Sequence, residues 1–265
     1  MNPFQGTPPP EVLLARAPLD AVFCQVRFPT ILSIGKDDYV ASFQEALRKD
    51  YPRAEPLTIQ TFPFQIPGLE LPTGGPTVKH HRFSTADRRW RLNLAPDFIS
   101  LDTPKYTSRT EFLERLEQAF DVLATHIRPS HWNRLGVRYV DRIRGADLAE
   151  VNSFFQPELL GLLGVDAGGN HLKQALSEVL AEVAEGTLAV RWGLLPPQRT
   201  PDPIGIPAEP TSSWILDLDA FQERFDTMEP FDPVDLVARV RALSDRIYTF
   251  FRWAVQPAFL QKYGG

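Results

Sequence analysis

The chain has 265 residues, enough for one large domain or two of ordinary size. Its composition, 43% hydrophobic and 23% charged, is that of a globular protein, and its net charge of -5 argues against a general nucleic-acid-binding protein. The single cysteine, Cys24, excludes an intramolecular disulfide and any zinc site built from several cysteines.

The N-terminal segment, residues 1–18, is expected to be irregular, because it contains five prolines and proline donates no backbone hydrogen bond. No apolar run approaches the roughly 20 residues of a membrane-spanning helix, and the N-terminus lacks the pattern of a secretory signal. We therefore expect a cytoplasmic protein without membrane contact. Residues 19–265 are expected to form a single domain.

Hydrophobic periodicity predicts a strand, a helix, four further strands and a second helix in the first half of the chain. The second helix follows a candidate N-cap at Thr107 or Ser108. Pro63 places its strand at a sheet edge or at a bulge. The predicted strands are 19–28, 57–66, 77–84, 89–94 and 98–102, and the helices are about 40–50 and 112–127.

The second half begins with a strand at 134–144 and continues with a mixture of helices and strands. Residues 196–210 contain six prolines and little apolar content. We expect them to form a stiff surface connection that does not pack, and the alternative is a partner-binding arm. The other predicted elements are helices at 154–163, 172–183 and 233–255 and strands at 187–195 and 214–218.

These elements predict an α+β fold, in which a mainly antiparallel sheet carries amphipathic helices on its apolar face. The segment Trp90-Arg-Leu-Asn-Leu is similar to Trp214-Ile-Leu-Asp-Leu, and each comes before an amphipathic helix. The similarity suggests an internal duplication of a β-α-β-β-α unit, with pseudo-repeats at 19–130 and 131–265.

The strand at 134–144 has a polar face of arginines. At the two-residue period of a strand, Arg134, Arg138 and Arg142 fall on one side and apolar residues on the other. A guanidinium keeps its charge, so each needs water, a carboxylate or an anionic ligand. Two further arginines on neighbouring strands could extend this face, with aromatic residues nearby. The candidate anion-binding residues are Arg82, Arg91, Arg134, Arg138 and Arg142, with Trp90 and Tyr139.

Three interpretations of these arginines stay open. They could pair with Asp97, Asp102 or Asp141, or with the acidic segment 217–235, which would leave a solvated sheet face. They could instead form an anion groove that binds phosphates with aromatic support. The third interpretation is a protein interface.

No other motif indicates catalysis or cofactor binding. His80 and His81 are adjacent, and adjacent strand residues point to opposite faces, so they predict no shared metal site. The glycine pairs lack phosphate-loop spacing, and no nucleophile elbow is present. We therefore predict no catalytic residues, no metal and no cofactor.

Four ordered motifs carry a resemblance to a family. They are Ala15-Arg-Ala-Pro-Leu-Asp-Ala-Val-Phe with Arg27-Phe28-Pro29, Phe43-Gln-Glu-Ala-Leu, Trp90-Arg-Leu-Asn-Leu-Ala-Pro-Asp-Phe-Ile-Ser-Leu with Tyr106, and Arg134-Leu-Gly-Val-Arg-Tyr-Val-Asp-Arg-Ile. From about Ala15 to the final helix, the chain resembles a sporadically distributed family of uncharacterised bacterial and archaeal proteins of about this length. Where that family often has an aromatic residue just after the Tyr106 position, this chain has Ser108-Arg109-Thr110.

The resemblance implies no catalytic residues. The patchy distribution of the family suggests an accessory component of a bacterial antiviral defence or toxin-antitoxin module. Long amphipathic helices and a stiff proline loop suit a partner surface, so we expect a non-enzymatic binding or adaptor protein that acts through a protein partner or as a homo-oligomer. The alternative is a protein that binds or processes nucleotides or RNA with the arginine-lined sheet face.

Overall fold

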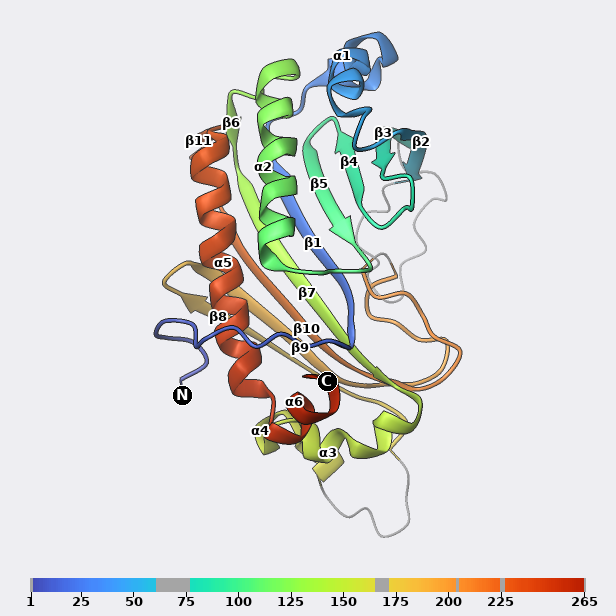
Figure 1. Ribbon diagram of the computed structural model, residues 1–265, viewed down its shortest axis with the longest axis vertical. Helices are drawn as coiled ribbons and strands as arrows, with labels where there is room; N and C mark the ends of the chain where they lie inside the picture. Colours follow the sequence, from blue (N-terminus) through green and yellow to red (C-terminus); the bar gives the residue numbers. More distant parts are fainter. Residues whose placement is uncertain (1, 61–76, 165–171, 204, 225–226, 265) are drawn as a thin grey trace, which may run out of the picture.

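The computed structural model describes residues 2–60, 77–164, 172–203, 205–224 and 227–264. This part of the chain is built on one antiparallel sheet of nine strands. The long helices α2 (Arg109–His126) and α5 (Pro233–Ala254) contact each other on one face of the sheet (Figure 1). The predicted α+β fold is confirmed.

The other elements complete the sheet and its ends. The strands of the large sheet are β1 (Leu19–Arg27), β2 (Arg53–Gln60), β3 (Thr77–Ser84), β4 (Arg91–Ala95), β5 (Phe98–Thr103), β7 (Arg134–Arg144), β8 (Ala175–Val183), β9 (Gly186–Leu195) and β10 (Ser213–Glu223). A small second sheet pairs β6 (His131–Trp132) with β11 (Glu229–Pro230). The shorter helices are α1 (Asp37–Leu47), α3 (Val151–Phe154), α4 (Pro157–Leu160) and α6 (Pro257–Gly264), with 3-10 turns η1 (Leu32–Gly35), η2 (Gly145–Glu150) and η3 (Gly161–Gly164).

The two halves of the chain follow the same path through the sheet. The strand order is β2-β3-β4-β5-β1-β7-β10-β9-β8, with β1 and β7 paired at the centre. In each half, a central strand leads through a helical segment to the sheet edge, and the later strands return inwards until the last one pairs with the central strand. A long helix then follows. Four strands return in the first half and three in the second, so neither half is the predicted β-α-β-β-α unit, and the duplication stays a prediction.

The two tryptophan motifs that suggested the duplication lie on strands that are not equivalent. Trp90 directly precedes β4, which is separated from β1 by β5, whereas Trp214 lies in β10, the direct neighbour of β7. The counterpart of β10 in the first half is β5. The similarity of the motifs therefore comes from the apolar alternation that buried strands share, and that part of the prediction is wrong.

Helices α2 and α5 bury apolar stripes against the sheet. Ser108 is the N-cap of α2, where its hydroxyl accepts a hydrogen bond from the backbone N–H of Glu111 (3.1 Å), and the side chain of Asp232 caps α5 in the same way. Each fully buried aliphatic or aromatic side chain contributes about 1.5–3 kcal/mol. The buried residues of the predicted stripes are Phe112, Leu116, Phe120, Leu123 and Ile127 for α2, and Val240, Leu243, Ile247, Phe250 and Ala254 for α5.

The predicted helix at 172–183 is wrong, because residues Ala175–Val183 form the strand β8, which pairs with β9. Its apolar residues also recur at three and four positions, which is a helical pattern, but pairing with β9 overrides that local preference. The hairpin returns at Gly186, where φ is 147° and a Cβ atom would lie 2.4 Å from the carbonyl oxygen of Phe221. The predicted helix at 154–163 is shorter than expected, because Pro157 separates α3 from α4.

Residues 2–18 form neither helix nor strand, as predicted, and cross α5 before they enter β1 (Figure 1). Phe4 packs against Phe250 at a ring distance of 5.8 Å. The predicted strand at 57–66 is part of β2 up to Gln60, and its remainder lies outside the described residues. In the described part of the chain, no helix combines the length and the apolar character needed to cross a membrane.

Candidate functional site

All five predicted arginines lie on one face of the sheet, opposite α2 and α5. In β7, Leu135 and Val137 belong to the helix-side core, so the alternating arginines point away from it. The pairing of β3 with β4 and of β4 with β5 continues the same alternation across the sheet. We call this face the arginine face, and its arginines are Arg82, Arg91, Arg134, Arg138 and Arg142.

Arg138 lies at the middle of the arginine face and is held by two carboxylates. Its Nε and Nη2 donate to the two carboxylate oxygens of Asp217 (2.7 and 2.9 Å), and its Nη1 donates to Asp202 (2.7 Å). Burial lowers the pKa of Arg138, but these charged hydrogen bonds outweigh burial and raise it overall. At Gly205, a Cβ atom would lie 2.5 Å from Arg138 Nη1, so the loop passes directly over the guanidinium.

The proline-rich loop, residues 196–210, covers the arginine face near Arg142. The Nη1 of Arg142 donates to the carbonyl oxygen of Pro207 (2.7 Å) and to Glu209 (3.2 Å). Ile206 is fully buried in a small cluster that includes Val140 of β7. The expectation that this loop does not pack is therefore wrong, because one isoleucine and its backbone carbonyls dock onto the sheet despite the six prolines.

The other three arginines of the arginine face have internal partners as well. Arg91 Nε donates to Asp102 (2.5 Å), and Arg82 Nε donates to Asn93 (2.8 Å). Burial raises the pKa of Asp102, and the nearby Arg91 opposes that effect. Arg134 lies 3.7 Å from the carboxylate of Asp219 and over the ring of Phe221.

The two predicted aromatic residues do not join the arginines. Trp90 is buried on the helix side, where it packs against Phe112 and lies under the guanidinium of Arg115. Tyr139 is on the helix side of β7, with its hydroxyl 3.4 Å from that of Tyr106. Aromatic support for an anion on the arginine face would need other side chains.

The arginine face carries a surplus of acids around Arg138. A depression there is lined by Arg138 and Arg191 and by four carboxylates, Glu178, Asp202, Asp217 and Asp219. An anion would meet net negative charge at this point. Of the partners expected for the arginines, Asp102 and the start of the acidic segment 217–235 are used.

Asp141 lies on the other face of the sheet, among the helices, and does not pair with the arginines. The same two-residue alternation that grouped Leu135, Val137 and Ile143 places Asp141 with them. It is 5% exposed. The sequence therefore contained the signal for a buried carboxyl group on the apolar side of β7, and that signal was missed.

The outer edge of β8 is a second exposed feature that the sequence prediction missed. β8 ends the sheet, and within the described ranges no strand pairs with its outer side. It contains none of the prolines, lysines or arginines that usually protect an edge, whereas β2 at the opposite edge contains Pro56. Its exposed apolar side chains are Leu176 (37%), Val179 (37%) and Leu180 (70%).

No protein-family model matches the chain, and no curated protein matches it either. The resemblance drawn from the sequence motifs therefore stays a prediction.

Proposed function

We propose that the protein is a non-enzymatic binding protein that acts as two identical copies joined along β8. The observation that supports this proposal is the uncovered β8 edge, nine residues long, with three exposed apolar side chains. A strand of this kind has free backbone groups that pair readily with another strand, and the added strand covers the apolar side chains.

A second copy can pair with this edge in an antiparallel register centred on Val179. When two β8 strands pair about Val179, Glu178 of each copy lies opposite Leu180 of the other, and Glu182 lies opposite Leu176. The two Leu180 side chains are then diagonal neighbours on one face. Centring the pair on residue 178 or 180 instead would place glutamates opposite each other, which is destabilising.

A dimer formed along β8 displays each remaining surface of the protein twice, so it can bind two partner molecules, as an adaptor does. A role in a cytoplasmic bacterial defence or toxin-antitoxin module is proposed from the sequence resemblance alone. Nucleotide or RNA binding on the arginine face has less support, because Arg138 and Arg142 already bind carboxylates that a phosphate would have to displace.

Sedimentation equilibrium tests the proposal on three proteins. Leu180→Glu places a new carboxylate opposite Glu178 of the second copy, while Leu162→Glu makes the same change on η3 at a similar exposure, 66% against 70%. We expect dimer masses for the wild type and for Leu162→Glu, and a monomer mass for Leu180→Glu. A monomeric wild type, or a dimeric Leu180→Glu, would contradict assembly along β8.

A further inference from the structure

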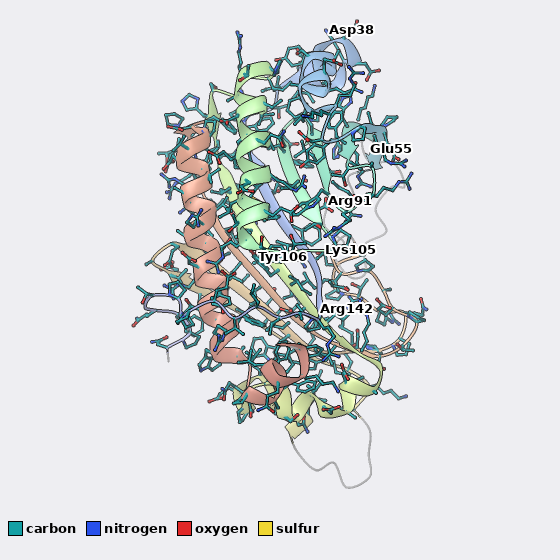
Figure 2. The ribbon with its side chains drawn as sticks, viewed as in Figure 1. Asp38, Glu55, Arg91, Lys105, Tyr106 and Arg142 are labelled. Atoms are coloured by element: carbon teal, nitrogen blue, oxygen red, sulfur yellow. The ribbon has the colours of Figure 1, made fainter. Side chains whose placement is uncertain are left out.

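A cavity of about 130 Å³ lies on the helix side of the sheet, beneath the N-terminal segment. Its walls come from residues 11–17, the start of α2, the middle of α5, and strands β7 and β10. Figure 2 shows Tyr106 at the foot of α2, beside this region. The lining is mainly apolar and aromatic, and includes Leu14, Tyr106, Tyr139, Leu218, Ile247 and Phe251.

The N-terminal segment forms the outer wall of this cavity and is fixed on both sides of it. The backbone N–H of Val12 donates to the Tyr248 hydroxyl (2.8 Å), which in turn donates to the carbonyl oxygen of Pro10 (3.2 Å). Further along, the N–H of Arg16 donates to the carbonyl oxygen of Tyr263 (3.0 Å). These bonds hold an otherwise irregular segment over the space between α5 and β7.

Asp141 lines the cavity and has no hydrogen-bond partner among the residues that the structure describes. The nearby hydroxyls of Tyr106 and Tyr139 are directed to each other at 3.4 Å. Burial, with a smaller effect of Asp20, raises the pKa of Asp141 to about 7. A buried carboxyl group without a partner is costly, and proteins retain few of them.

The remaining charge in the cavity favours a cation. Arg109 lines the wall, but its guanidinium forms an ion pair with Asp245 and lies over the ring of Tyr248. Glu11 adds a second carboxylate to the lining. A bound anion would be repelled by Asp141, whereas an ammonium group would supply the missing hydrogen-bond donors and gain from the aromatic rings.

We propose that this cavity binds a small organic amine, with its ammonium group on Asp141 and its apolar body among the aromatic side chains. The volume suits a body about the size of one aromatic ring, since a cavity of similar volume in another protein holds benzene. The site is separate from the β8 edge, so a test of amine binding and a test of the proposed assembly have independent outcomes.

Isothermal titration with three matched probes tests the inference: benzylamine, benzyl alcohol and benzoate. At pH 8, above the pKa of about 7 at which Asp141 ionises, we expect benzylamine to bind the wild type at least tenfold more tightly than benzyl alcohol. Benzoate should not bind. This comparison uses only the wild-type protein, so it does not depend on the folding of any variant.

Two variants locate the binding. Asp141→Asn is nearly isosteric, and we expect it to weaken benzylamine binding at least tenfold without affecting benzyl alcohol. Asp38→Asn makes the same chemical change at an exposed position of α1 and should leave both affinities unchanged. The inference is overturned if benzylamine does not bind, if benzyl alcohol or benzoate binds equally well, or if folded Asp141→Asn retains full affinity for the amine.

Discussion

Charged residues on the two faces of β7 lie in different environments. On the arginine face, Arg138 and Arg142 are surrounded by carboxylates and backbone carbonyls, so each guanidinium is neutralised locally. On the helix side, Asp141 faces an apolar cavity and has no such compensation within the described structure. The first arrangement stabilises the fold, whereas the second reserves a polar group for a ligand.

Asp217→Asn should reduce the free energy of unfolding by about 2–4 kcal/mol, because it breaks the two-oxygen contact with the half-buried Arg138. Glu45→Gln is the control, since it breaks an exposed ion pair with Arg48 that is worth at most about 1 kcal/mol. Urea unfolding of both variants measures the difference. Equal, small losses would show that Asp217 does not hold Arg138.

Asp141 should make stability depend on pH. Its pKa is raised from 3.8 to about 7, so ionisation is harder in the folded state. Its contribution to the free energy of unfolding should therefore fall between about pH 4 and pH 7 and stay constant above. Asp20 and Tyr263 interact with it electrostatically, and burial raises the pKa values of Tyr106 and Tyr139, which stay protonated in this range.

Asp141→Asn removes this ionisation and therefore tests the predicted direction of the pH dependence of stability. The variant should gain stability relative to the wild type as pH rises from 5 to 8, by about 2–3 kcal/mol, since about two pH units of this range lie below the pKa of about 7 and each is worth about 1.4 kcal/mol. Urea unfolding at both pH values gives the difference. A gap that stays the same at the two pH values would show that Asp141 is solvated or already has a partner.

At the scale of elements, the sequence predicts those whose residue pattern agrees with their final environment. α2 and α5 have long apolar stripes and good caps at Ser108 and Asp232, so their positions follow from periodicity. The strand β8 could not be predicted in this way, because its residues favour a helix and form a strand only by pairing with β9. The docking of residues 196–210 depends on contacts with distant strands, which no local pattern contains.

Ile206→Ala tests whether that loop is packed. Ile206 is fully buried against Val140, so we expect a loss of about 2–4 kcal/mol in unfolding free energy. Leu162→Ala is the control, because Leu162 is 66% exposed and should contribute little. If thermal or chemical unfolding shows similar stability for both variants, the loop does not dock on the arginine face.

The candidate site, too, could be predicted only where it depends on local sequence. The alternation of β7 correctly grouped Arg134, Arg138 and Arg142, because side-chain direction in a strand is a local property. Their partners could not be assigned, since the carboxylates come from distant positions such as Asp202 and Asp217. The cavity could not be predicted from the sequence either, because its walls come from distant segments that meet only where the N-terminal segment crosses α5.

At the scale of the whole molecule, the two halves share one sheet and one core. β1 and β7 pair along nearly their full length, and α2 contacts α5, so neither half has a complete core alone. We expect fragments 1–130 and 131–265 to remain unfolded when expressed separately. Circular dichroism with thermal denaturation checks this, and a cooperative transition in either fragment would contradict the proposed single domain.

The central claim is that two copies pair about Val179, and a single disulfide experiment tests it most directly. Residues directly opposite in an antiparallel pair have Cα atoms about 4.5–5.5 Å apart, within reach of a disulfide. The natural Cys24 is buried and does not compete. Under mild oxidation, Val179→Cys should form a covalent dimer and Ala181→Cys, whose counterpart lies several residues away, should not. A Val179→Cys protein that stays monomeric, or equal cross-linking of both, would contradict the account.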